Sequence, residues 1–291
     1  MKITTFTHNN TTRVGIVTGD EIIDTLTYNA VPRSMNEFLA ADLINSDFLN
    51  DTVKNHGARI SLADVKLEAP VQRPGKFLGI GLNYLDHIDE TGRDRPQSPT
   101  VFNKQITCVI GPGAAIHRPK VSDKLDYEGE LGVVIGKRCR HVPRDRAAEV
   151  IAGYLAVNDV SVRDWQAKSP TMTLGKSFDT HGPTGPWLVT ADEIGDPHKL
   201  DIKTHVNGEL RQSSNTRHLL FDCYYLVEYL STVFTLEPGD IISTGTSSGV
   251  GARMTPPGFM HPGDIVSIEI EKIGILENPV IEEPVTTGFI R

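Results

Sequence analysis

The chain lacks the features that mark secreted, disulfide-rich and membrane proteins. Its cysteines, Cys108, Cys139 and Cys223, are odd in number and far apart, which fits neither a disulfide framework nor a Cys-x-x-Cys metal site. No apolar run approaches the roughly 18 residues of a membrane span, and the first residues lack the apolar core of a signal peptide. We therefore expect reduced thiols, a cytoplasmic location and no membrane partner.

An excess of basic residues is also lacking. The 291 residues include 29 lysines and arginines against 37 aspartates and glutamates, and the net charge is −8. No basic cluster interrupts this balance, although binding to duplex nucleic acid requires one to displace counterions. We expect no nucleic-acid partner, and the length suits one large domain or two ordinary ones.

Common cofactor-binding signatures are missing as well. Gly79-Ile-Gly81 follows a predicted strand, but Tyr84 stands where a dinucleotide-binding fingerprint needs glycine. Gly245–Gly249 lacks the Gly-Lys-Ser/Thr ending of a phosphate-binding loop, and His-Glu-x-x-His does not occur. The sequence therefore supports neither a Rossmann nor a P-loop site.

The first seventy residues have the pattern of a small α/β unit. Four short runs of β-type residues are separated by turn signals: Ile3–Phe6, Thr12–Thr18, Glu21–Asp24 and Val65–Glu68. A capping-box pattern predicts a helix over Ser34–Leu43, and the prolines and glycine of Ala69–Gly75 mark a boundary. We expect domains at residues 1–70 and 71–291.

Beyond residue 75 the chain is rich in predicted strands. They cover Lys76–Ile80, Leu131–Ile135, Tyr154–Val157, Trp187–Thr190, Asp201–Val206, Asp240–Thr244 and Asp264–Ile270. Helices are predicted only over Arg146–Ile151 and Leu219–Phe234, and glycines and prolines bound many elements. This pattern favours a β-rich α+β fold over alternating βαβ units.

Alternating carboxylates precede one of these strands. Asp126, Glu128 and Glu130 would point to one face of a strand that then becomes wholly apolar. Carboxylates at the entrance to a core repel one another and resist desolvation unless a cation neutralises them. Such oxygen ligands suit Mg²⁺, Mn²⁺ or Ca²⁺ rather than zinc. The alternative is a solvated strand edge that binds no metal.

A further metal ligand would have to come from elsewhere in the chain. Asp159 ends an apolar run and therefore lies at a strand end, whereas Asp164 and Asp179 compete on composition alone. The spacing does not choose among these three aspartates.

His87 and Glu90 are the second candidate pair. Three residues apart in a helical turn, they share a face, and a carboxylate beside an imidazole fixes its tautomer and raises its basicity. The pair could activate water, although an exposed His–Glu pair without function is the alternative. The next segment, Thr91–Pro99, is polar and carries Arg93 and Arg95, so we expect a lid over an anionic substrate.

Seven ordered motifs resemble those of the fumarylacetoacetate hydrolase family and cover about residues 70–280. They are Gly81–His87, Tyr127–Gly136, Val157–Asp159 with Gln166, Gly175–Asp179, Gly182–Trp187, Val206–Gly208 and Glu237–Thr246. The resemblance implies a fumarylacetoacetate hydrolase-like mixed β-roll catalytic domain after a small N-terminal α/β domain. It also implies a homodimer.

The resemblance assigns roles to the acidic residues and to one lysine. It implies that Glu128, Glu130 and Asp159 hold Mg²⁺ or Mn²⁺. Lys176 would polarise a carbonyl or stabilise an oxyanion.

The resemblance also assigns the base and the substrate contacts. It implies that His87 and Glu90 form a water-activating dyad. Tyr84, Gln166 and Thr246 match positions that contact substrate in the family.

Three positions depart from the commonest family pattern. Leu85 replaces a small or basic residue, Asn103–Gln105 replaces aromatic-Lys-Pro, and Ser247 stands where proline is common. We expect all three to border the substrate and to affect its identity more than the reaction class.

The function that the resemblance implies is hydrolysis of a carbon–carbon bond in a 2,4-diketo acid. An acylpyruvate of the fumarylpyruvate or maleylpyruvate type would give pyruvate and a carboxylic acid. The alternatives are an oxaloacetate decarboxylase and an isomerase or hydratase of aromatic degradation. A binding module without catalysis is disfavoured, because it would not require His87, Glu90 and Lys176 together.

Overall fold

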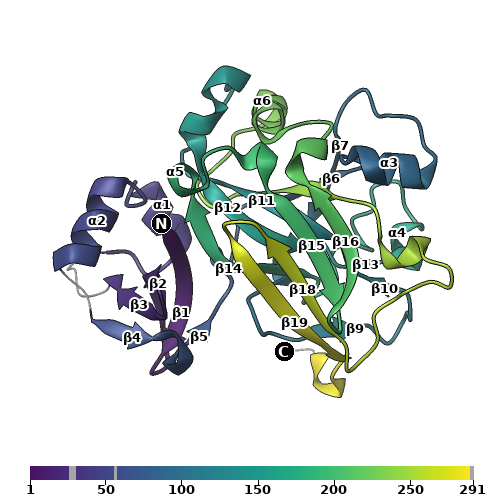
Figure 1. Cartoon of the computed structure of the whole chain (residues 1–291), viewed down its shortest axis with the longest axis horizontal. Coiled ribbons are helices and arrows are strands. Elements are labelled where there is room, and N and C mark those ends of the chain that lie inside the picture. The colour runs from purple at the N-terminus through teal and green to yellow at the C-terminus, as the bar shows by residue number, and fades with distance from the viewer. Residues whose placement is uncertain (26–30, 56–57, 289–291) are drawn as a thin grey trace.

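The computed structural model describes residues 1–25, 31–55 and 58–288, so the last three residues of the expected second domain lie outside it. A twelve-stranded mixed sheet has the order β4-β3-β2-β1-β14-β12-β11-β17-β6-β7, with β5 beside β1 and β8 beside β14 (Figure 1). Its strands are β1 (Lys2–His8), β2 (Thr11–Thr18), β3 (Glu21–Asp24), β4 (Arg59–Ser61), β5 (Lys66–Leu67), β6 (Phe77–Gly81), β7 (Thr100–Lys104), β8 (Val109–Ile110), β11 (Gly129–Ile135), β12 (Ile151–Asn158), β14 (Gly182–Thr190) and β17 (Ile241–Thr246).

A second sheet of five strands, in the order β16-β15-β18-β19-β9, packs against the large sheet. Its strands are β9 (Ile116–Arg118), β15 (Asp201–Val206), β16 (Glu209–Asn215), β18 (Ile265–Ile270) and β19 (Gly274–Glu282). A separate short pair consists of β10 (Leu125–Asp126) and β13 (Ser161–Val162). The main hydrophobic core joins buried side chains of both sheets. The expected β-rich α+β fold is confirmed.

Short helices cover the sheets, and one of them bears out the capping signal. The described α-helices are α1 (Met35–Ala40), α2 (Ser46–Asn55), α3 (Leu85–Thr91), α4 (Arg163–Gln166), α5 (Ala191–Ile194) and α6 (Cys223–Val233). The Ser34 hydroxyl accepts a hydrogen bond from the Glu37 amide at 3.3 Å, as the capping box predicts, although α1 ends at Ala40 and not at Leu43. No helix within the described ranges is both long enough and apolar enough to span a membrane.

The predicted strands form, with ends shifted by a few residues, but both helices predicted beyond residue 75 need correction. Arg144–Val150 is a 3₁₀ helix that leads directly into β12 at Ile151. The other helix starts at Cys223 and not at Leu219, because the Asp222 carboxylate caps it by accepting from the Tyr225 amide.

The N-terminal residues form a small α/β unit beside the rest of the molecule (Figure 1). Strand β1 extends the large sheet, because Lys2 and Ile3 pair with β14. A hydrophobic cluster joins Ile3 and Phe38 of this unit with Phe77 and Val134 of the following part. The division at residue 70 remains a prediction, and the two parts share one sheet and part of their core.

Candidate metal and substrate site

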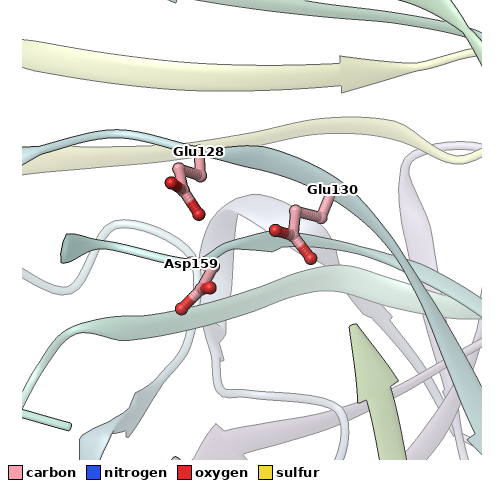
Figure 2. A group of neighbouring side chains, drawn as sticks. All are labelled: Glu128, Glu130 and Asp159. Atoms are coloured by element: carbon pink, nitrogen blue, oxygen red, sulfur yellow. The ribbon is translucent and has the colours of Figure 1, made fainter. Parts of the chain in front are cut away.

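Three carboxylates converge where β11 and β12 lie side by side. Pairing of Gly129 with Asn158 places Glu128 and Glu130 beside Asp159, the residue that follows β12. One oxygen of each carboxylate lies within 4.8 Å of one oxygen of each of the others. Figure 2 shows the three groups turned toward one common space, and they are only 5, 2 and 0 % exposed. The alternative of a solvated strand edge is therefore wrong.

The structure also shows which of the three candidate aspartates lies beside the two glutamates. Asp159 belongs to the cluster, whereas Asp164 accepts a hydrogen bond from Ser122 and Asp179 lies outside the cluster. Asp126 does not belong to this group of three carboxylates, and a break in the strand separates β10, which carries it, from β11. Its carboxylate binds Arg163 at 2.7 Å instead.

Buried cations already neutralise part of this negative charge. Lys176 Nζ donates to Glu128 at 2.5 Å and to Asp159 at 2.7 Å. Lys104 Nζ donates to Asp159 at 2.6 Å, and Arg163 Nη1 donates to Glu128 at 2.6 Å. The two lysines are 2 % exposed, so these contacts lie in a region of low dielectric constant. Repulsion is thus not the main interaction of Glu128.

Glu130 has a different environment although it is only two residues away. Its Oε2 accepts from the Ser243 hydroxyl at 2.5 Å and from the Gly245 amide at 2.8 Å. Within the described residues it forms no ion pair. Burial and the negative charges of Asp159 and Glu128 raise the pKa of Glu130 to about 8. Burial acts in the same direction on Glu128, but the charges of Lys176 and Arg163 outweigh it and lower the pKa of Glu128 to about 2.

This donor set fits a divalent cation. Six buried charged groups and the half-buried Arg163 lie together here: Asp126, Glu128, Glu130, Asp159, Lys104, Lys176 and Arg163. Four carboxylates against three cations leave one net negative charge when all are ionised, and the uncompensated group is Glu130. Oxygen-only ligands suit Mg²⁺ or Mn²⁺ better than zinc.

His87 and Glu90 lie on α3, as the helical spacing predicts. His87 Nδ1 donates to Glu90 Oε2 at 2.9 Å, and Glu90 Oε1 accepts from the Gly249 amide at 2.9 Å. The helix is anchored through Asp86, which accepts from the hydroxyl of Ser214 at 2.6 Å. The His87 and Glu90 side chains are 13 and 23 % exposed. With Nδ1 donating to the carboxylate, Nε2 is the nitrogen left to accept a proton.

One cavity of about 550 Å³ connects the carboxylates with His87 of this dyad. Its wall contains His87, Lys176 and the three acidic residues of the cluster. Gln166 and Thr246, which the sequence predicts as substrate contacts, also line it. Apolar and sulfur-containing side chains complete the wall: Ile80, Leu82, Phe102, Met172 and Val250.

Tyr84 is placed differently from the other predicted substrate contacts. Its side chain is fully buried and does not line the cavity, and the residue occupies the N-cap position of α3 without a side-chain capping hydrogen bond. Leu85 and Ser247 do not line the cavity either, whereas Lys104, within the divergent Asn103–Gln105 segment, contacts Asp159 directly. Of the segment Thr91–Pro99, only Thr91 and Arg93 belong to the cavity wall.

Sequence reasoning assigned no role to Arg163 or Lys104, although both lie at the site. Arg163 stands three residues before Gln166 on α4 and donates to its Oε1 at 3.0 Å. Its Nη2 is buried without a hydrogen-bond partner among the described residues. The helical spacing from Gln166 was the available signal for Arg163, whereas Lys104 comes from β7 and no spacing connects it with Asp159.

The fold and this site define a strand-rich α+β protein with buried carboxylates in the wall of a cavity. Residues 76–281 match the family described as fumarylacetoacetate (FAA) hydrolase C-terminal, and the chain belongs to this family. Its named relatives are enzymes of more than one reaction class.

Three of these relatives illustrate the range. A mitochondrial oxaloacetate tautomerase from Xenopus laevis is 40% identical over 266 residues, covering 90% of this chain and 83% of that protein. A maleylpyruvate hydrolase from Sphingobium sp. SYK-6, solved with manganese(II) and pyruvate, is 32% identical with a TM-score of 0.82 and coverage of 98% and 100%. A 5-carboxymethyl-2-hydroxymuconate delta-isomerase from Mycobacterium smegmatis is 36% identical with a TM-score of 0.79 and the same coverage.

Proposed function

We propose that the protein is a divalent-metal-dependent hydrolase that cleaves a carbon–carbon bond in a 2,4-diketo acid to give pyruvate and a carboxylic acid. The observation that carries this proposal is that the carboxylate cluster and His87, which is paired with Glu90, line one cavity. The maleylpyruvate hydrolase that binds manganese and pyruvate supports both the metal and the substrate class.

The metal ligands would be Glu128, Glu130 and Asp159. Bound Mg²⁺ or Mn²⁺ would compensate the remaining negative charge and act as a Lewis acid toward the keto acid. The buried Nη2 of Arg163 has no hydrogen-bond partner among the described residues, and Lys176 Nζ uses two of its three N–H groups on Glu128 and Asp159. The remaining N–H groups could donate to anionic oxygens of the substrate.

The dyad would supply the base. His87 Nε2 takes a proton from water while Glu90 holds the Nδ1 proton, and the hydroxide adds to the carbonyl distant from the carboxylate. The carbon–carbon bond then breaks, the acyl part leaves as a carboxylic acid, and the enolate of pyruvate takes up the proton. Lys176 stabilises the oxyanion of the addition step.

Isomerisation of a keto acid is the second candidate. Of the three relatives named above, the tautomerase from Xenopus laevis has the highest sequence identity to this chain. The His87–Glu90 dyad could equally move a proton between carbon and oxygen. Decarboxylation of oxaloacetate would pass through the same enolate but needs no attacking water, so the dyad gives it no specific support.

Removing the imidazole separates carbon–carbon bond cleavage from decarboxylation. We expect His87→Ala to reduce cleavage of an acylpyruvate by about 10²–10⁴-fold, the usual contribution of a general base, and to spare most of any oxaloacetate decarboxylation. Cleavage, tautomerisation and decarboxylation should be assayed in parallel with Mg²⁺, Mn²⁺ and excess EDTA. Cleavage by His87→Ala within threefold of the parent, or full activity in EDTA, contradicts the hydrolytic proposal.

The expected homodimer remains a prediction that light scattering can check.

A further inference from the structure

The metal cluster and the cavity do not explain the burial of Asp126. Its side chain is fully buried, yet it belongs neither to the group of three carboxylates nor to the residues that line the cavity. Burying a carboxylate costs free energy unless it is paired and hydrogen-bonded. The function of Asp126 must therefore lie in the groups that it contacts.

Four donors occupy the carboxylate of Asp126. Its Oδ1 accepts from the amides of Tyr127 at 3.0 Å and Gly251 at 2.8 Å. Its Oδ2 accepts from the Ala252 amide at 2.9 Å and from Arg163 Nε at 2.7 Å. A carboxylate offers about four acceptor positions, so these bonds use its capacity and fix its orientation.

The close approach of the backbone to Asp126 depends on Gly251. A Cβ at this position would lie 2.6 Å from Asp126 Oδ1 and 2.4 Å from the Gly258 carbonyl oxygen. Both distances are too short for contacts between carbon and oxygen, so glycine is required here. The neighbouring residues Val250 and Ala252 line the cavity. Asp126 therefore fastens a segment of the cavity wall from behind.

The same carboxylate restrains Arg163, which lines the cavity. Arg163 uses Nε on Asp126, and it uses Nη1 on Glu128 at 2.6 Å and on Gln166 at 3.0 Å. Its Nη2 is buried and has no hydrogen-bond partner among the described residues. A guanidinium is planar and rigid, so the bonds at Nε and Nη1 together fix the direction of the two N–H groups on Nη2.

We propose that Asp126 is a positioning residue that holds Arg163 so that its Nη2 binds an anionic oxygen of the keto acid. This inference rests on the proposed function and deepens it, because it gives a role to a residue outside the cavity wall. A buried N–H group without a partner is costly, and an oxygen of the substrate would satisfy it. Asp126 orders the arginine in advance and so reduces the cost of binding.

The test measures the binding of pyruvate and of Mn²⁺ separately. Pyruvate is titrated calorimetrically into the enzyme saturated with Mn²⁺, and Mn²⁺ is titrated into the metal-free enzyme. We expect Asp126→Asn to weaken pyruvate binding by about tenfold, because Arg163 loses a charged hydrogen-bond partner. The affinity for Mn²⁺ should stay unchanged, because Asp126 is not part of the carboxylate cluster.

Asp164→Asn is the matched control. Asp164 follows Arg163 on α4, accepts a hydrogen bond from Ser122 at 2.7 Å and does not line the cavity. The control makes the same chemical change one residue away from the arginine, so the affinities for pyruvate and for Mn²⁺ should both stay unchanged.

A double-mutant cycle shows whether Asp126 acts through Arg163. Arg163→Met should weaken pyruvate binding, and Asp126→Asn should cause no further loss when it is added to Arg163→Met. The double variant removes both partners of this buried ion pair and so leaves neither charge unpaired. If Asp126→Asn alone does not fold, the double variant is compared with Arg163→Met. Equal pyruvate affinity then supports the proposal, and a further loss overturns it.

The outcomes distinguish this inference from the proposed function. Unchanged pyruvate affinity in Asp126→Asn, equal losses of pyruvate and Mn²⁺ affinity, or additive losses in the cycle would overturn the positioning role and leave the proposed function intact. Failure of pyruvate to bind the Mn²⁺-loaded parent would overturn the proposed function and this inference with it.

Discussion

Glu128 and Glu130 illustrate how strongly individual partners determine the chemistry of one residue type. Both are buried glutamates in the same cluster, and burial disfavours the charged form of each. Lys176 and Arg163 contact Glu128 and lower its pKa to about 2, whereas Glu130 has hydroxyl and amide donors only and a pKa raised to about 8. A divalent cation would be held by one carboxylate that is already ionised and another that ionises most readily when the cation is present.

The stability of the metal-free protein should therefore depend on pH through Glu130. Between the ordinary pKa of 4.5 and about 8, the unfolded chain has lost this proton and the folded protein keeps it. The contribution of Glu130 to stability is thus complete below the lower value and is lost as pH rises toward the upper one. Glu130→Gln keeps an oxygen acceptor for Ser243 and removes the titration.

Urea unfolding in EDTA between about pH 5 and pH 8 measures this effect through the free energy of unfolding. We expect the parent to lose more stability than Glu130→Gln over this range, and Mn²⁺ to restore the parent at the upper end. Parallel pH curves for the two proteins would show that Glu130 does not titrate as proposed. Glu128 acts in the opposite direction, because its lowered pKa stabilises the fold above pH 4.5 and this contribution is lost toward pH 2.

At the scale of single residues, the sequence could identify the proposed metal ligands more easily than the cationic residues that contact them. The Glu-Gly-Glu spacing indicated Glu128 and Glu130, but it did not show that Asp126 binds Arg163 across the break between β10 and β11. Asp159 could be chosen only by resemblance, since its contact with Glu128 depends on the pairing of β11 with β12. Lys104 lies 55 residues from Asp159 in sequence, and no local rule connects them.

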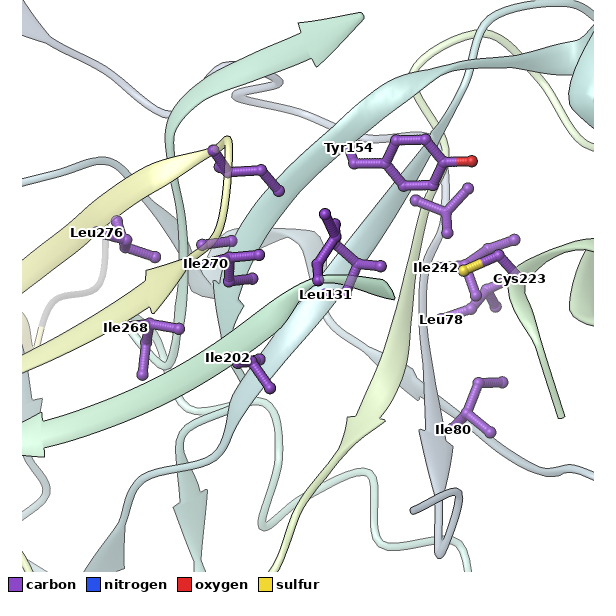
Figure 3. Packing of buried hydrophobic residues seen from close by; sticks show 14 of the residues in the cluster. Leu78, Ile80, Leu131, Tyr154, Ile202, Cys223, Ile242, Ile268, Ile270 and Leu276 are labelled. Carbon is purple, nitrogen blue, oxygen red and sulfur yellow. The ribbon is translucent and has the colours of Figure 1, made fainter. Parts of the chain in front are cut away.

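Several strands rich in apolar residues were predictable, whereas the polar strand β16 was not. Strands β6, β12 and β18 contribute buried apolar side chains to the core seen in Figure 3, where Leu78, Tyr154 and Ile268 lie among the labelled residues. Strand β16 was missed because its sequence, Glu-Leu-Arg-Gln-Ser-Ser-Asn, has no apolar period. It is recruited by pairing with β15, a tertiary interaction that its own residues do not indicate.

The segment between α3 and β7 should change its protection when the site is filled. Residues 92–99 contain no helix or strand, and most of their side chains are exposed. Trypsin can cut after Arg93, whereas Pro96 blocks a cut after Arg95. If this segment closes as a lid over a bound keto acid, Mn²⁺ with 2-oxoglutarate should slow this cleavage several-fold, because proteolysis requires the segment to open. Mass spectrometry of the fragments over time measures the rate, and equal rates with and without these ligands would contradict closure of a lid.

At the scale of the whole molecule, the N-terminal unit and the catalytic part are joined by a continuous sheet. Strand β1 pairs with β2 on one side and with β14 on the other. Trp187 on β14 lies at this junction, where its indole N–H donates to the Ile273 carbonyl at 2.6 Å and Lys2 lies 4.7 Å above its ring. Exposure of the β14 edge would follow removal of the first strand, and unpaired edges favour aggregation.

We therefore expect the molecule to unfold as one cooperative unit, although the sequence predicts two domains. Trp165→Phe leaves Trp187 as the sole tryptophan and as a reporter of the junction, while far-ultraviolet circular dichroism follows all strands. Both signals should give the same urea midpoint, because the shared cluster around Ile3 cannot be opened on one side alone. Ile3→Ala should lower stability by about 2–4 kcal/mol and move both midpoints together, as expected for a fully buried side chain. A first transition seen by circular dichroism alone, with Trp187 unchanged, would instead show that residues 1–70 unfold independently.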